Sequence, residues 1–191
     1  QSYYYAKEFA NLGWKVSFLT KKGKEPIACF NNEGINIIYY KKHTSPLRTL
    51  LYFIKIIKKY KFDVVFYRNN TVQLGILAIL SKIFNYKLIW SVKHDDFCGK
   101  TSATKKERLL TSLPSKIKQF NWLFNDRLFK YGVLSSFLVL AQNKYQKRII
   151  LKDFKKSSDI LYSGTNIPKY NTSRMNQILF ISTIRDFKRP E

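Results

Sequence analysis

Short apolar runs alternate with helical segments along most of the chain, and this order restricts the fold more than any other feature of the sequence. The runs are rich in β-branched and aromatic residues, as buried strands are, whereas the segments between them repeat their apolar residues at helical spacing. The predicted strands are residues 15–20, 35–40, 63–67, 88–92, 137–141, 159–162 and 178–182, and the predicted helices are 2–12, 46–57, 71–84, 117–131 and 144–151. Because parallel strands cannot be joined by tight turns, the alternation predicts an α/β fold, a Rossmann-like parallel sheet flanked by helices.

Titratable side chains follow two of these strands at the point where each apolar run stops. Arg68 follows the third predicted strand, and His94, Asp95 and Asp96 follow the fourth. In open parallel sheets, ligands bind in the crevice beyond the carboxyl ends of the strands. A neutral imidazole both donates and accepts hydrogen bonds, and a guanidinium binds phosphate through its planar fork. These four residues are therefore candidates for a binding site, with loop caps and surface ion pairs as the structural alternatives.

Neither a metal site nor a transmembrane helix is predicted. The histidine and aspartates after the fourth strand, even with Cys98 beside them, lack the second pair of ligands that marks a zinc motif. Cys29 and Cys98 are far apart in the sequence, which favours reduced thiols and a cytoplasmic location over a disulfide framework. The longest apolar runs, such as residues 74–80, are much shorter than the roughly 20 residues that span a bilayer.

The chain is strongly basic, with 35 Lys and Arg residues against 12 Asp and Glu residues and a formal net charge of +23. Such a charge predicts attraction to anionic partners: nucleic acid, anionic lipid or the phosphates of nucleotide sugars. Biased codon use in an A+T-rich genome explains the abundance of Lys, Asn, Ile, Tyr and Phe equally well. The basic residues are spread over most elements and carry no helix-turn-helix, zinc-finger or RNA-recognition signature, so nucleic-acid binding is not favoured.

Five sequence motifs follow one another in the same order as the motifs of a known enzyme family, which the chain resembles. They are NLGWKVSFLT at 11–20, DVVFYRNN at 63–70, IWSVKHDDF at 89–97, LYSGTNIP at 161–168 and ILFISTIRDFKRPE at 178–191. In this order and spacing they resemble the acceptor-side domain of family 4 glycosyltransferases of the GT-B fold. They are similar to its second strand, the strand ending in His or Arg, the Thr-x-His-Asp/Glu turn, the Pro-Asn-Gly hinge and the opening of its donor-binding domain.

The resemblance implies a division of the chain and a truncation at both ends. Residues 1–164 would form the Rossmann-like acceptor-side domain without its first strand, residues 165–177 an interdomain linker, and residues 178–191 the start of the donor-binding domain. About half of an enzyme would then be present. Where the family usually has His, Gly and Arg, this chain has Trp14, Ser182 and Thr183. The last two departures weaken the implied donor binding.

The resemblance also implies roles for individual residues. His94 would be the catalytic residue that positions the donor and acceptor hydroxyls, while Arg68, Asp95 and Asp96 would bind the acceptor. Two further basic residues, Lys188 and Arg185, would contact the diphosphate of the donor.

The activity implied is transfer of a sugar from a nucleotide-diphosphate sugar to a glycan or lipid-linked acceptor, with retention of configuration and no further cofactor. The segment 105–130 combines basic with aromatic residues. That composition suits an anionic membrane surface, and packing of the aromatics on the sheet is the alternative. We therefore expect a cytoplasmic protein, peripheral on the inner face of the membrane, that is inactive as a fragment. An inactive remnant of a glycosyltransferase gene and a basic nucleic-acid-binding module are the alternative functions.

Overall fold

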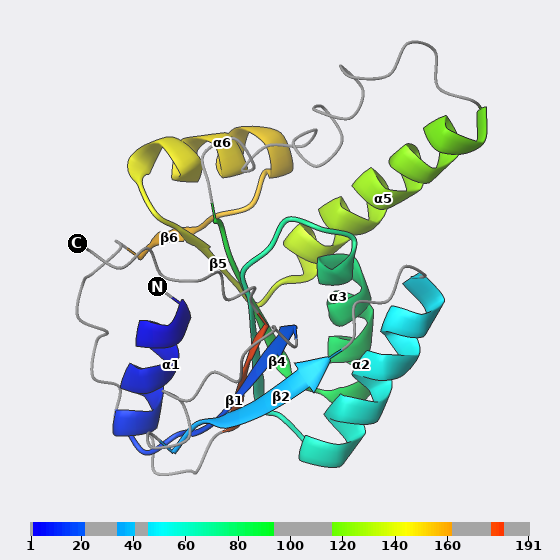
Figure 1. Cartoon of the computed structure of the whole chain (residues 1–191). Helices are drawn as coiled ribbons and strands as arrows, with labels where there is room; N and C mark the ends of the chain where they lie inside the picture. Colours follow the sequence, from blue (N-terminus) through cyan, green and yellow to red (C-terminus); the bar gives the residue numbers. More distant parts are fainter. Residues whose placement is uncertain (1, 22–33, 41–45, 94–115, 162–176, 182–191) are drawn as a thin grey trace, which may run out of the picture.

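The computed structural model describes residues 2–21, 34–40, 46–93, 116–161 and 177–181. Within these ranges, seven strands form one sheet in which each neighbouring pair is parallel. The strands are β1 (Lys15–Lys21), β2 (Asn36–Tyr40), β3 (Val64–Tyr67), β4 (Lys87–Ser91), β5 (Leu138–Ala141), β6 (Asp159–Ile160) and β7 (Gln177–Ile181). The helices are α1 (Ser2–Asn11), α2 (Pro46–Tyr60), α3 (Gln73–Phe84), α5 (Lys116–Ser135) and α6 (Lys144–Phe154). The predicted α/β fold, a Rossmann-like parallel sheet flanked by helices, is confirmed (Figure 1).

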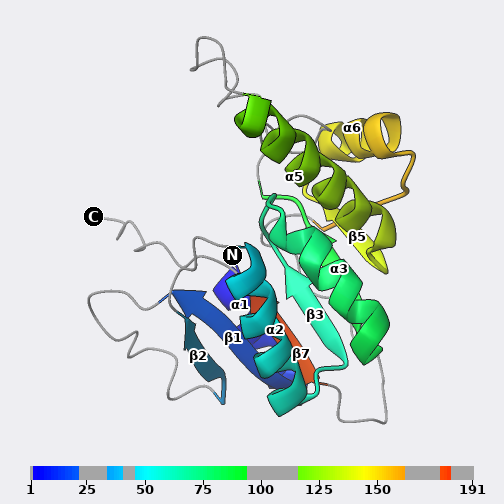
Figure 2. The same cartoon turned by 90° about the vertical axis from the view of Figure 1, so that its right-hand side faces the viewer.

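The two faces of the sheet carry different helices. On one face α2, α3 and α5 lie side by side (Figure 2), and side chains of α6 join the same buried cluster. On the other face α1 covers β1 and β3, where its Tyr5 and Ala6 pack against Val16, Phe18 and Phe66. In β1 and β3, alternate residues belong to opposite clusters because strand side chains point to opposite faces. The core therefore has two layers separated by the sheet.

The strand order places a strand from late in the sequence at the centre of the sheet. Of residues 178–191, predicted to open a donor-binding domain, the structure describes 178–181. These residues belong to β7, which lies in the middle of the sheet in the order β2-β1-β7-β3-β4-β5-β6. Leu179 pairs with Ser17 of β1 on one side and with Val65 of β3 on the other. A parallel strand at the centre of a sheet needs a backbone partner on each side. For β7, these partners are β1 and β3. The central position beside β1 is thus occupied by a strand from late in the sequence. The expected linker, 165–177, lies outside the described residues except for its last residue.

Candidate functional site

The strand order locates the crevice that such sheets use for ligands. From β1 the chain continues outward to β2, whereas from β3 it continues in the other direction through β4, β5 and β6. The direction of winding therefore reverses at β7, between β1 and β3. In open α/β sheets, ligands bind beyond the carboxyl ends of the strands at this reversal. The residues that follow β3 border this position.

Arg68 lies at this point, directly after β3. Its side chain is only 6% exposed, and its guanidinium carbon is 5.9 Å from the ring centre of Tyr5 in α1. The ring of Tyr5 lies 6.1 Å from the ring of Phe66. Phe66 precedes Arg68 by two residues, so the two side chains are on the same face of the strand. Burial lowers the pKa of Arg68 from its ordinary value, and the nearby Tyr5 acts in the opposite direction. A guanidinium keeps its proton even so, which leaves a buried positive charge at the crevice.

The loop after β3 is held in place by hydrogen bonds from two strands. The Tyr67 hydroxyl lies 2.5 Å from Oγ1 of Thr71 and donates to Oε1 of Gln73 at 3.2 Å. From β4, the indole of Trp90 donates to the backbone oxygen of Asn69 at 3.3 Å. Trp90 is completely buried, so its ring has one position available. The backbone on either side of Arg68 is therefore anchored, as a binding side chain requires.

The strand that precedes His94 is the direct neighbour of the strand that precedes Arg68. Tyr67 of β3 pairs with Trp90 of β4, and the Val92 N–H donates to the Leu140 oxygen at 2.9 Å just beyond β4. The structure thus brings together the two strand ends that the sequence singled out. The side chains of His94, Asp95 and Asp96 lie outside the described residues, as do those of Arg185 and Lys188. Of the predicted site residues, the structure describes Arg68.

Sequence reasoning missed two polar contributions to this edge. Tyr5 belongs to the predicted helix 2–12, and no sequence spacing links it to Arg68. At the end of β5, the Asn143 side chain accepts the backbone N–H of Gln146 at 2.8 Å, and the buried Gln146 side chain accepts that of Gln142 at 2.7 Å. The Asn-x-x-Gln spacing at a helix start was a signal that could have revealed this cap.

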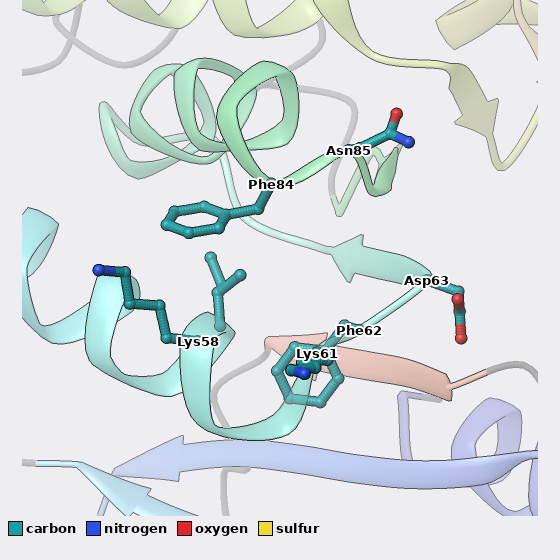
Figure 3. A pocket seen from close by; sticks show the side chains of 7 residues that line it. Lys58, Lys61, Phe62, Asp63, Phe84 and Asn85 are labelled. Carbon is teal, nitrogen blue, oxygen red and sulfur yellow. The ribbon is translucent and has the colours of Figure 1, made fainter.

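A pocket of about 390 Å³ lies at the opposite end of the sheet (Figure 3). It is formed where α2 and α3 end and β3 begins, and Lys61 and Asn85 end the two helices with left-handed backbone conformations. Its lining residues are Ile57, Lys58, Lys61, Phe62, Asp63, Phe84 and Asn85. Because it lies at the amino ends of the strands, this pocket is separate from the crevice beside Arg68.

The part of the chain that the structure describes offers neither a cluster of metal ligands nor a membrane-spanning helix. Among these residues, no three or more His, Cys, Asp and Glu side chains group together in a way that could hold a metal ion. None of the described helices has the length and apolar character needed to cross a bilayer.

The chain matches no protein-family model, and no curated protein matches it significantly.

Proposed function

We propose that this chain forms the acceptor-side domain of a retaining glycosyltransferase that acts on a nucleotide-diphosphate sugar and a glycan or lipid-linked acceptor. The observation that carries the proposal is the buried Arg68 at the carboxyl end of β3, beside the point where the sheet reverses its winding. The strand next to it, β4, leads into the His-Asp-Asp sequence. The motif order of the sequence supports the same function.

In this proposal, one group of residues holds the reacting hydroxyls and the acceptor, and a second group acts on the diphosphate of the donor. His94 positions the donor and acceptor hydroxyls through hydrogen bonds, and Asp95 and Asp96 accept hydrogen bonds from acceptor hydroxyls. Arg68 binds an anionic group of the acceptor, because a guanidinium pairs with phosphate or carboxylate through two parallel hydrogen bonds.

Two basic residues late in the chain act on the donor. Lys188 and Arg185 stabilise the negative charge that develops on the departing nucleoside diphosphate. The enzyme works in the cytoplasm, on the inner face of the membrane where a lipid-linked acceptor is presented.

The test is sugar transfer by the full-length protein, measured as transfer of labelled sugar from a panel of nucleotide sugars. His94→Ala should abolish transfer. Wild-type turnover by this variant would contradict the role assigned to His94.

Arg68 is tested by the acceptor dependence of the same reaction. Arg68→Met should raise KM for a phosphate-bearing acceptor by roughly 10-fold to 100-fold, because a hydrogen bond to a charged group contributes about 1.5–3 kcal/mol. Arg68→Lys should recover part of the loss, since it keeps the charge but not the planar fork. Arg148→Met, at an exposed position of α6, removes the same charge elsewhere and should leave KM unchanged. Equal effects of the Arg68 and Arg148 substitutions would refute acceptor binding by Arg68.

A further inference from the structure

Three neighbouring helices present one broad outer surface. Helix α3 lies between α2 and α5 and contacts both of them (Figure 2). All three pack their inner sides against the sheet, where they supply much of the larger buried cluster. We call the exposed residues of α2, α3 and α5 the three-helix face.

Large apolar side chains are exposed on each helix of this face. On α2, Leu47 and Leu51 are 64% and 57% exposed, and Ile83 of α3 is 65% exposed. On α5, Leu123 and Phe124 are half exposed. A single exposed leucine is ordinary in a folded protein, but apolar side chains that recur over adjacent elements mark a surface that contacts something.

Basic side chains share the same exposed stripes. On α2, Lys55 is exposed one helical turn after Leu51, and Lys58 and Lys59 are exposed one turn after Lys55. Lys82 on α3 and Arg127 and Lys130 on α5 are also exposed. Within these three helices as the structure describes them, Asp126 is the one acidic residue. The three-helix face is therefore both apolar and strongly positive.

We propose that the three-helix face binds the surface of an anionic lipid bilayer. Apolar side chains can enter the boundary between head groups and acyl chains while long basic side chains reach the lipid phosphates. A second copy of the chain does not fit, because the same surface on both partners would bring like charges together. Nucleic acid would leave the exposed leucines and isoleucines in water. This inference deepens the proposed function by naming the membrane partner, and it involves neither Arg68 nor His94.

Co-sedimentation of the full chain with vesicles tests the proposal. Vesicles of phosphatidylcholine and phosphatidylglycerol in equal parts should bind the protein at low ionic strength, and pure phosphatidylcholine vesicles should bind it weakly. Replacing Lys55, Lys58 and Lys59 by Gln should weaken binding about 100-fold, since each basic residue near an anionic surface contributes roughly fivefold. Replacing Leu47 and Leu51 by Ser should also weaken binding, by at least about tenfold.

A matched control removes the same charge from outside the face. The triple variant Lys144→Gln, Lys147→Gln, Arg148→Gln changes three exposed residues of α6 and should weaken binding less than about threefold. Circular dichroism shows whether each variant remains folded, and all these positions are exposed.

Four outcomes would overturn the proposal: wild-type protein that stays in solution with the anionic vesicles, an equal loss in the α6 control, unchanged binding by the leucine variant, and retention by duplex DNA in place of vesicles. His94→Ala should bind vesicles like the wild type, so failure of lipid binding and failure of sugar transfer are distinguishable.

Discussion

Replacing Gly75 by alanine should destabilise the protein, although alanine is the better helix former. Gly75 in α3 and Gly132 in α5 lie at the point where these two helices meet. A Cβ atom on Gly75 would lie 2.5 Å from Cγ of Leu128 and closer still to its backbone oxygen, whereas ordinary contacts begin near 3.4 Å. A Cβ on Gly132 would lie 2.7 Å from the backbone nitrogen of Gly75. The close approach therefore depends on both glycines.

The magnitude follows from two opposing effects. Alanine in a helix interior is favoured over glycine by about 1 kcal/mol. Against this, the nearest atom is backbone, so α5 as a whole would have to move by about 1 Å, and overpacking of this kind costs about 3 kcal/mol at the upper end of its usual range. The free energy of unfolding should fall by about 2 kcal/mol, which for a chain of this length lowers Tm by roughly 4–8 °C.

Urea unfolding followed by circular dichroism measures the change in the free energy of unfolding. Ile83→Ala introduces alanine at an exposed position of the same helix and should change that free energy by less than about 0.5 kcal/mol. The double variant Gly75→Ala, Gly132→Ala should lose less than the sum of the single variants, because the two sites touch and share one displacement of α5. Unchanged or increased stability of Gly75→Ala would refute this account of the helix contact.

Two further predictions concern the pH dependence and the centre of the sheet. The Tyr86 hydroxyl donates to the Leu77 oxygen at 2.5 Å, and burial raises the pKa of Tyr86 above its ordinary value of 10.0. Because the folded protein then holds this proton more tightly than the unfolded chain, the free energy of unfolding should fall as the pH rises above about 10. Tyr86→Phe should cost about 1 kcal/mol at neutral pH and flatten this decline in urea titrations; an equally steep decline would contradict the assignment. Leu179→Pro in β7 should lower the free energy of unfolding by roughly 3 kcal/mol or more, because a central strand cannot lose a ladder hydrogen bond without cost. Leu179→Val is its control, and a proline variant that unfolds at the same urea concentration would argue against a central β7.

Local features of the fold could be predicted because they depend on neighbouring residues. The predicted strand 63–67 corresponds to Val64–Tyr67, and the predicted helix 71–84 to Gln73–Phe84. Side-chain periodicity and the residues at the ends of each run carry this information. The same periodicity placed Arg68 at a strand end, next to the strand that leads into residue 94. The contact of Arg68 with Tyr5 was not predictable, because it joins residues that are distant in the sequence and follow no shared period.

The sequence by itself determined that the chain forms a parallel α/β sheet and that Arg68 follows the carboxyl end of β3. Only the tertiary structure decided that β7 lies between β1 and β3, that two glycines bring α3 and α5 together, and that α2, α3 and α5 lie side by side. The physical reason is that backbone hydrogen-bonding groups are alike in every strand. The residues of a strand therefore indicate that it is buried, whereas the packing of the whole sheet determines which strands lie beside it.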